Sequence, residues 1–522
     1  MPTSDFETAA PTATPAGDTP AGDTPAGDTS PGDTRPPPEP GTHDGRPGLG
    51  AHDGASFVAS LADDREVWVE GERVDVTTHP DFRPMLRTLA GLYDRQRSPE
   101  LGREMTFRSE VSGHPVSLSY LTPRTPEDLD RKWINSRHWV EGSHGQISRI
   151  PDFMANVAVG LHDFRHALGE VDPVFAENAE RYYLHCREND LVLTHGLGDP
   201  QVDRSVTPVQ RPELGLRVVH RDDSGIVVRG AKQIATLAPY AHDVLIYLSP
   251  ANYLREDPAY VCWFGARLDT PGLRILCRRS YHGQPHTLGS RFDEQDAMLV
   301  FDDAFIPRDR VFLLDDANTA VKGFHALNRW SLYTGQIRLH HRLRVMLGVA
   351  SLLAKSIGVD RFREVGALLG ELASYVSVVD LALKSITRDA TRTKSGLLAP
   401  GTTAALDSIA GHFSQRASAI VRQIGASGLI MQPAEGDLHA PDLRTALDLY
   451  MGGRDTPVED KSRMFRLAGD LVIDRFGMRQ ELYEAWNRGD PARVRSALYT
   501  TFTDLPGCEA AARVLADLLE QP

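Results

Sequence analysis

Cysteine is scarce in this chain. The 522 residues include four cysteines, Cys186, Cys262, Cys277 and Cys508, which are widely separated and form no C-x-x-C pair. A disulfide framework or a structural zinc site would need regularly spaced cysteines, so the sequence predicts neither of them and no metal site. Scattered thiols are typical of a reducing compartment, and we therefore expect a cytoplasmic protein.

Basic clusters and long apolar runs are also lacking. Asp and Glu total 71 against 57 Lys and Arg, for a formal net charge of -14, and no basic block is long enough to follow a phosphate backbone. We expect no nucleic-acid partner. With no run of about 18 apolar residues and no basic or apolar signal region at the N-terminus, we also expect no membrane span and no secretory signal. No G-x-G-x-x-G lies between a strand and a helix, which argues against a nicotinamide site.

The N-terminal part of the chain contains two regions of different composition. Residues 1–54 are rich in Pro, Gly, Thr, Ala and Asp and repeat Thr-Pro-Ala-Gly-Asp from Thr14, a composition that predicts a disordered tail. Residues 55–194 are predicted to form a helical domain, with helices at about 84–95, from Thr125, and over 152–168 and 173–189. Thr125 followed by Pro, Glu and Asp is typical of a helix start, since Thr caps the helix and Pro suits its first turn.

The rest of the chain changes periodicity twice. Residues 195–320 carry short apolar runs that predict strands, at 216–219, 225–230, 244–247, 260–264, 273–276 and 298–301. Residues 321–522 return to helical periodicity in four long segments, at 325–357, 359–393, 402–430 and 459–487. The predicted fold class is therefore α+β, with an N-terminal helical domain, a middle β-sandwich or barrel domain and a C-terminal four-helix bundle.

One stretch combines a charge and an aromatic ring before an apolar run. Arg149 and Phe153 are four residues apart, and if a helix begins near Pro151 they share a face and can address the same small ligand. Taken alone, Arg149 would be a helix-end charge, His195 a structural histidine and Thr236 a strand residue. Only the wider pattern of the chain changes these interpretations.

That wider pattern consists of motifs spread over about residues 60 to 500. They are 148–153, Thr194-His195 with 199–204, 225–232 with 235–236, 290–297, 306–307 and 476–484. In this order they resemble the flavin-dependent 4-hydroxyphenylacetate 3-monooxygenase family, the large oxygenase component of two-component systems. The resemblance implies the acyl-CoA dehydrogenase-like fold.

The resemblance also implies roles for individual residues. Arg149 and His195 correspond to catalytic residues near the substrate hydroxyl, and Ser148 and Phe153 to further substrate-binding positions. The implied flavin-binding residues are His195, Gln201, Val202, Asp203, Arg204, Thr236, Phe476, Gly477 and Arg479. Thr236 corresponds to a threonine near the reactive N5 edge of the flavin.

Two positions depart from the family pattern. Phe153 stands where the family has a substrate-facing tyrosine, and Ser148 where glycine is usual. Phenylalanine lacks the hydroxyl that would donate to or accept from the substrate oxygen. Ser148 and His144 are candidates to replace that hydrogen bond. We therefore expect an aromatic substrate that is bulkier or less polar than 4-hydroxyphenylacetate.

The resemblance further implies a cofactor, a reaction and partners. FAD, supplied as FADH2 by a separate NAD(P)H:flavin reductase, would react with O2 to a C4a-hydroperoxyflavin that hydroxylates an aromatic substrate, in secondary metabolism or aromatic catabolism. A homotetramer is also implied, with residues 325–357 and 402–430 as candidate contacts.

Three alternatives follow from the same residues. A same-fold N-oxygenase or oxidase acting on an amine or indole stays open because a fold does not determine a reaction. A non-catalytic flavin-binding protein also stays open, although Arg149, His195 and Thr236 argue against it. An iron–sulfur 4-hydroxybutyryl-CoA dehydratase is excluded, since Cys186 is the only thiol of the predicted N-terminal domain and a cluster needs several thiolate ligands.

Overall fold

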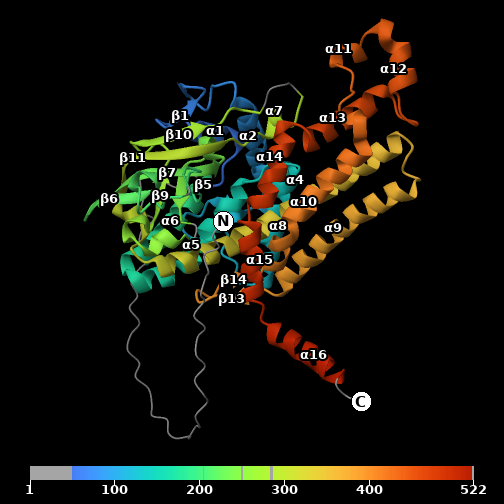
Figure 1. Cartoon of the computed structure of the whole chain (residues 1–522). Coiled ribbons are helices and arrows are strands. Elements are labelled where there is room, and N and C mark those ends of the chain that lie inside the picture. Colours follow the sequence, from blue (N-terminus) through green and yellow to red (C-terminus); the bar gives the residue numbers. More distant parts are fainter. Residues whose placement is uncertain (1–49, 204, 249–250, 282–285, 520–522) are drawn as a thin grey trace. The chain divides into compact units, whose positions relative to one another are not determined.

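Helices dominate the N-terminal part of the protein (Figure 1). The computed structural model describes residues 50–203, 205–248, 251–281 and 286–519, which belong to one compact unit, residues 40–522. The first helices are α1 (Gly54–Ser60), α2 (Arg83–Arg97), α3 (Gly102–Met105), α4 (Pro126–Gly142), α5 (Pro151–Val171) and α6 (Pro173–Glu188). The predicted start of α4 is confirmed, because Thr125 and Asp128 cap it reciprocally through side chain and backbone.

Residues 50–54 correct the predicted extent of the tail. The backbone N–H of Gly50 donates to the Glu188 carbonyl at 2.9 Å, and that of Ala51 donates to the Pro115 carbonyl at 2.7 Å. The N–H of His52 donates to Asp190 Oδ2 at 2.9 Å. These bonds order a polar segment by satisfying its backbone groups, which composition alone does not reveal. The disorder predicted for residues 1–49 lies outside the described residues.

The middle region contains two sheets that share a core. Their strands are β1 (Glu66–Val69), β2 (Glu72–Val74), β5 (Leu193–His195), β6 (Arg217–Asp222), β7 (Gly225–Thr236), β8 (Asp243–Ile246), β9 (Cys262–Arg267), β10 (Leu273–Cys277), β11 (Asp296–Pro307) and β12 (Val311–Leu314). One sheet has the order β2-β1-β10-β11-β7-β6 and the other β12-β9-β8-β5. The buried rings of Phe264 on β9 and Phe301 on β11 lie 5.8 Å apart, so the sheets pack against each other as in a sandwich.

The N-terminal part is not purely helical. Strand β1 pairs in parallel with β10, and β2 pairs with β1, so residues 66–74 extend the larger sheet. The short strands β3 (Thr106–Arg108) and β4 (Pro115–Ser117) form a separate pair. Sequence periodicity missed this arrangement because strand pairing over such a distance leaves no local signal. The domain boundaries after residues 54, 194 and 320 stay proposals.

The C-terminal part is built on long helices. These are α8 (Ala317–Ser356), α9 (Arg363–Arg388), α10 (Ala404–Gly425), α13 (Val458–Val472), α14 (Arg475–Trp486), α15 (Pro491–Thr500) and α16 (Leu505–Leu518). Shorter elements are α7 (Gly289–Phe292), α11 (Glu435–Leu438), α12 (Arg444–Met451), β13 (Thr391–Arg392) and β14 (Leu398–Ala399). The single helix predicted over 459–487 is wrong, since Asp474 is extended and its side chain accepts from the Phe476 N–H, which starts α14 as a new helix.

Helix α9 is long and apolar. Among the described residues it is the one helix that meets the length and composition criteria for crossing a membrane, and 11% of its most apolar window is buried. One such helix is weak support for a membrane span. Its Glu371 pairs with Arg416 of α10 at 2.7 Å, and its Tyr375 ring stacks on Phe413 at 4.4 Å. We therefore interpret α9 as a bundle helix with one uncovered apolar face.

Candidate active site at the start of helix α5

The start of α5 brings Arg149 and Phe153 together as predicted. Pro151 is the first residue of α5, and the Arg149 guanidinium carbon lies 4.1 Å from the Phe153 ring centroid. The Tyr483 ring of α14 lies on the same guanidinium at 5.1 Å. Arg149 Nε donates to His195 Nε2 at 3.3 Å. The two residues predicted to be catalytic are therefore in direct contact.

Arg149 carries a buried positive charge that has no carboxylate beside it. Arg149 is 8% exposed and His195 5% exposed. Within the described ranges the guanidinium makes no ion pair; it contacts two rings and His195. Burial and the charge of Arg149 hold the pKa of His195 well below its usual range, so the imidazole is neutral. A buried cation beside a neutral base favours an anionic ligand, because that ligand would compensate the charge.

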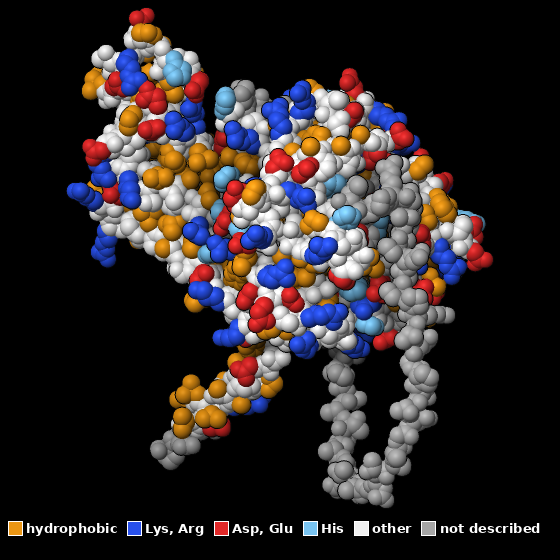
Figure 2. All heavy atoms as spheres, turned by 180° about the vertical axis from the view of Figure 1, so that it is seen from behind, with side chains coloured by type: hydrophobic (Ala, Val, Ile, Leu, Met, Phe, Trp, Pro, Cys, Tyr) orange, Lys and Arg blue, Asp and Glu red, His pale blue; other side chains and the backbone are white. Residues whose placement is uncertain are grey.

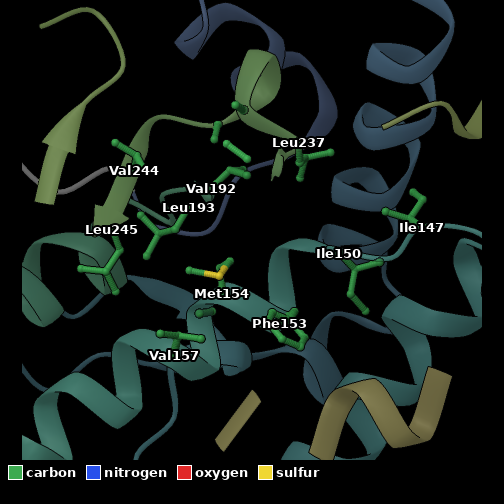
Figure 3. Close-up of a cluster of buried hydrophobic side chains, with 14 of the residues drawn as sticks. Ile147, Ile150, Phe153, Met154, Val157, Val192, Leu193, Leu237, Val244 and Leu245 are labelled. Carbon is green, nitrogen blue, oxygen red and sulfur yellow. The ribbon is translucent and has the colours of Figure 1, made fainter. Parts of the chain in front are cut away.

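An apolar wall borders this pair. Figure 3 shows Phe153 and Met154 of α5 in one cluster with Leu193 of β5 and Leu245 of β8, all of them buried. The ring centroids of Phe153 and His195 are 6.3 Å apart in an edge-on arrangement. The wall therefore offers hydrocarbon where the family pattern has a phenolic hydroxyl.

Ser148 is engaged by groups other than a ligand. Its N–H donates to Glu294 Oε2 at 2.9 Å, and its hydroxyl donates to Gln480 Oε1 at 3.2 Å and accepts from Arg479 Nη1 at 2.8 Å. Glu294 also accepts from the Arg149 N–H at 2.9 Å. The structure thus gives Ser148 a positioning role, and its contact with substrate stays a prediction.

The acidic residues that hold this turn were missed by sequence reasoning. Arg479 of α14 donates to Glu294 at 2.5 Å and also pairs with Asp296. Arg278 Nε also pairs with Asp296, at 3.0 Å. Burial opposes the charge of Asp296, but Arg479 and Arg278 hold the pKa of its carboxyl well below the usual range. The motif 290–297 was the available signal, although nothing in it assigned a role to Glu294 or Asp296.

Thr236 ends strand β7 of the larger sheet, where it contacts Thr194, the residue before His195. The Thr194 hydroxyl donates to the Thr236 carbonyl at 2.8 Å, which joins β5 to the end of β7. The Thr236 hydroxyl donates to Asp296 Oδ1 at 2.8 Å. The hydrogen of Thr236 is therefore committed to Asp296, and its oxygen can accept.

The predicted flavin loop runs beside the same strand. The Gln201 N–H donates to Gln233 Oε1 at 3.3 Å, and Val202 is 45% exposed. Ile234, the neighbour of Gln233, is 57% exposed and has a φ of 59°, which is strained for a β-branched residue. The Asp203 carboxylate accepts from the Ser205 N–H at 2.9 Å. Arg204 lies outside the described residues.

Phe476 and Gly477 pack inside the protein. Phe476 is 1% exposed, and a Cβ added to Gly477 would lie 2.4 Å from the Leu471 backbone. Gly477 is required there because α13 and α14 approach closely. Contact of Phe476, Gly477 or Arg479 with a cofactor stays a prediction.

The loop and strand end fit the flavin that the resemblance implies. An isoalloxazine has apolar faces and a polar edge. Val202 and Ile234 supply exposed apolar surface, while Thr236 and His195 supply polar groups at the ends of β7 and β5, which the Thr194–Thr236 bond joins. The residues that would hold FAD are these four, together with Gln201. The chemistry that FAD supplies when bound is electron transfer to O2.

Other polar residues near Arg149 and His195 divide into two groups. His144 is exposed and its ring lies against Phe292 at 6.4 Å, so it does not replace the lost hydroxyl. Tyr247 Oη lies 3.0 Å from His195 Nδ1. The buried Tyr483 hydroxyl has no hydrogen-bond partner among the described residues. Sequence reasoning missed both tyrosines; Tyr483 belongs to the motif 476–484, whereas nothing distinguished Tyr247.

Comparison with solved structures supports the fold. The crystal structure of a 4-hydroxyphenylacetate 3-monooxygenase oxygenase component complexed with FAD and 4-hydroxyphenylacetate matches with a TM-score of 0.84 at 33% identity, over 90% of this chain and 99% of that one. A 4-hydroxybutyryl-CoA dehydratase from N. maritimus matches with a TM-score of 0.76 at 20% identity, over 90% and 95% of the two chains. The latter shows the shared fold alone. The predicted α+β, acyl-CoA dehydrogenase-like fold is confirmed.

Comparison with known sequences covers nearly the whole chain. It is 34% identical over 485 residues to the 4-hydroxyphenylacetate 3-monooxygenase oxygenase component of Thermus thermophilus, covering 90% of this chain and 98% of the relative. It is 30% identical over 462 residues to the 4-nitrophenol 2-monooxygenase oxygenase component of a Rhodococcus species, covering 85% and 87%. Residues 53–313 match the 4-hydroxyphenylacetate 3-hydroxylase N-terminal description and residues 317–517 the C-terminal one. The chain therefore belongs to the 4-hydroxyphenylacetate 3-hydroxylase family, the oxygenase components of two-component flavin-dependent monooxygenases.

Proposed function

We propose that this protein hydroxylates a phenol that is bulkier or less polar than 4-hydroxyphenylacetate. The observation that carries the proposal is the buried guanidinium of Arg149, which has no carboxylate partner within the described residues and contacts the neutral His195. A phenolate supplies the missing negative charge in that position. The relatives from Thermus thermophilus and Rhodococcus are named for phenolic substrates with different para substituents, so the family accommodates a change at that end of the ring.

The chain's own residues prepare the phenol. When the phenol binds, Arg149 turns its donor from His195 Nε2 to the phenol oxygen. The freed Nε2 takes the proton of the phenolic hydroxyl, so that the O–H bond breaks and an N–H bond forms. Arg149 holds the resulting phenolate by a charge-assisted hydrogen bond and lowers the pKa of the bound phenol. The negative charge enriches the ring carbons in electrons. Burial of both residues keeps water from the reacting centre.

FAD is the cofactor in this proposal. Crystal structures of the family's oxygenase component contain FAD, and the bound reduced flavin supplies the electrons that activate O2. A separate NAD(P)H:flavin reductase delivers it. We expect much tighter binding of reduced than of oxidised FAD, which anaerobic titration would measure. Equal affinity for the two forms would contradict delivery in the reduced state.

Specificity follows from the wall at position 153. Phe153 is 2% exposed and stacks on Arg149, and its apolar neighbours continue the surface (Figure 3). A hydrocarbon wall offers no partner to a polar group and stabilises apolar substituents at about 25 cal/mol per Å² of area buried. We therefore expect substituted phenols with apolar para groups to be better substrates than 4-hydroxyphenylacetate.

A substrate panel tests the function. Purified protein would receive reduced FAD from a reductase with NADH and O2, together with phenols whose para groups are carboxymethyl, nitro, alkyl or aryl. Mass spectrometry would measure oxygen transferred from labelled O2. We expect a hydroxylated phenol, with the alkyl and aryl substrates preferred. Indole and amine substrates belong in the same panel, because oxygenation of these alone, or hydrogen peroxide as the sole product, would overturn the proposal.

His195→Ala provides the first control of the panel. Loss of the base should reduce product formation by about 10²- to 10⁴-fold, while reduced FAD is still oxidised with release of hydrogen peroxide. The matched control is His144→Ala, since His144 is exposed and lies against Phe292. An unchanged product yield in His195→Ala would remove His195 from the mechanism.

We also propose that the protein is a cytoplasmic homotetramer. Helices α15 and α16 contain no buried residue, and α16 exposes Val514 and Leu515 at 63% and 65%; Figure 2 shows hydrophobic side chains along this helix. Isolated helices of this length are marginal in water, so a second copy is expected to cover them. These helices add to the contacts expected at 325–357 and 402–430. Light scattering of the chain and of a version ending at residue 503, which lacks α16, would test the role of that helix.

A further inference from the structure

A chain of four hydrogen bonds runs from the C-terminal bundle to Arg149. Asn328 Nδ2 of α8 donates to the Phe324 carbonyl at 2.8 Å, and the Tyr247 hydroxyl lies 3.2 Å from Asn328 Oδ1. Tyr247 Oη lies 3.0 Å from His195 Nδ1. Arg149 Nε donates to His195 Nε2 at 3.3 Å. These hydrogen bonds therefore involve both ring nitrogens of His195, the predicted base.

The amide of Asn328 sets the direction of this chain. Because Nδ2 donates to a carbonyl, the other amide atom is Oδ1, which can only accept. The single proton of Tyr247 must then point to Asn328. Towards His195 the Tyr247 oxygen has only lone pairs to offer. His195 Nδ1 must carry a hydrogen to complete the bond.

Arg149 leads to the same result from the opposite end. A guanidinium nitrogen can donate but cannot accept. The nitrogen that accepts from it, Nε2 of His195, must have a free lone pair. Both ends of this hydrogen-bond chain therefore require the same neutral tautomer of His195, protonated at Nδ1 and unprotonated at Nε2.

We propose that Tyr247 and Asn328 are positioning residues that hold His195 in the Nδ1-protonated tautomer, so that Nε2, which accepts from Arg149 in this structure, is the base once Arg149 donates to a bound substrate instead. The catalytic part of this inference rests on the proposed function, whereas the tautomer itself does not. Tyr247 follows β8 and Asn328 belongs to α8, so the sheet region and the bundle act together on a histidine of β5. A carboxylate orients the base in serine hydrolases by the same principle.

The surroundings of Tyr247 keep its hydroxyl neutral. Tyr247 is fully buried, and burial raises the pKa of its hydroxyl, so that the group keeps its proton. When Nε2 takes the phenol proton, the imidazolium is stabilised by its Nδ1–H bond to Tyr247. The same proton returns to the phenol oxygen in the product. Tyr247 and Asn328 lose no proton in this cycle.

Nitrogen NMR measures the tautomer directly. The protein carries 19 histidines, so the chain would be labelled with ¹⁵N in histidine and the His195 signals identified by their absence in His195→Gln. We expect one protonated and one unprotonated nitrogen, with the proton on Nδ1. A His195 ring protonated at Nε2 in the unaltered protein would overturn the proposal, whether or not any substrate is hydroxylated.

Variants of Tyr247 and Asn328 provide the second test. Tyr247→Phe leaves Arg149 as the one partner that favours the Nδ1-protonated tautomer, so the share of the other tautomer should rise. We expect kcat/KM for a phenol to fall about tenfold to a hundredfold, as loss of a histidine-orienting partner does in metal sites. Asn328→Ala should act in the same direction, and Asn328→Asp, which keeps an acceptor for Tyr247, should restore the Nδ1-protonated form. The matched control is Tyr183→Phe, whose buried hydroxyl donates to the Tyr120 carbonyl.

The outcomes separate the two proposals. An unchanged tautomer and an unchanged kcat/KM in Tyr247→Phe would overturn the role of Tyr247, and an equal loss in Tyr183→Phe would reduce it to general stability. If the unaltered protein shows the expected tautomer but hydroxylates no phenol, the proposed function fails while the assignment of the tautomer stands.

Discussion

Two groups of buried charge meet in this protein, and they differ in how they are paired. On α14, Arg479 pairs with Glu294 and Asp296, and Glu484 pairs with Arg338 and Arg488; we call these the α14 ion network. At the start of α5, Arg149 has two rings and a neutral imidazole around it. The two groups are neighbours, because Tyr483 of α14 lies against both Arg149 and Arg479.

The difference distinguishes charged residues that stabilise the fold from a charged residue that can bind substrate. Charges of the α14 ion network compensate each other within the chain, and Glu294 uses its remaining capacity to hold the N–H groups of Ser148 and Arg149. The charge of Arg149 lacks such compensation inside the part of the chain that the structure describes. A ligand can supply the negative charge that a buried, unpaired cation lacks. We therefore assign substrate binding to Arg149 and a structural role to Arg479.

Arg479→Met should have the largest effect on stability. Removing Arg479 leaves Glu294 and Asp296 buried without their main partner, which costs about 3–5 kcal/mol of unfolding free energy. Denaturant unfolding would measure the loss. Arg463→Met is the control, since its side chain is 73% exposed and its ion pair with Asp460 lies on the surface. Similar changes in the two variants would contradict the supporting role of the network.

Acid should weaken the same network. Burial opposes the charge of Glu484, but Arg338 and Arg488 lower the pKa of its carboxyl from 4.5 to about 2. A folded-state pKa below the unfolded value stabilises the protein above pH 4.5, and this stabilisation, on the order of 3 kcal/mol, is lost as the pH falls towards 2. Unfolding measured between pH 6 and pH 3 should show the decline. Glu484→Gln should remove part of the slope, and an identical slope would refute the assignment.

Arg149→Met should give the opposite pattern to Arg479→Met. We expect kcat/KM for the phenol to fall about a hundredfold, as after loss of one donor to a developing anion. The free energy of unfolding should change by less than about 1 kcal/mol, because methionine fills similar space and removes an unpaired buried charge. Steady-state kinetics and denaturant unfolding of the same preparation would measure both quantities. A stability loss as large as that of Arg479→Met would contradict the proposal that Arg149 serves substrate binding and the α14 ion network serves stability.

Phe153→Tyr should have the smallest effect and should act on specificity. The added hydroxyl would lie near Arg149 and His195 and supply one hydrogen bond, worth about 1 kcal/mol. Because both substrates share the phenol oxygen, we expect this bond to raise kcat/KM for both. The less apolar wall should also raise the ratio of kcat/KM for 4-hydroxyphenylacetate to that for an alkyl phenol several-fold. Competition between the two substrates in one reaction would measure the ratio. An unchanged or lower ratio would show that position 153 does not determine the preference.

Local patterns predicted much of the fold. The helices at α2, α4, α5 and α6 and the six predicted strands occur close to the expected residues, because capping residues, proline and apolar periodicity act within a few residues. The break at Asp474 was missed because a short extended segment hardly disturbs the apolar periodicity on either side. Pairing of β1 with β10 joins residues about 200 positions apart, which no local pattern encodes.

The candidate site also combines features that local sequence predicted with features that only folding produces. The residue types at 149, 153 and 195 suggested a family and a departure from it, since each motif is a short run of letters. Three interactions join different elements: the contact between Arg149 and His195, the pairing of Arg479 with Glu294, and the hydrogen bond between His195 and Tyr247. Sequence alone thus determined the fold class, the chemical groups and the lost hydroxyl at Phe153. Only the tertiary structure decided which buried charges are paired and which tautomer His195 adopts, because both depend on distances between residues that folding brings together.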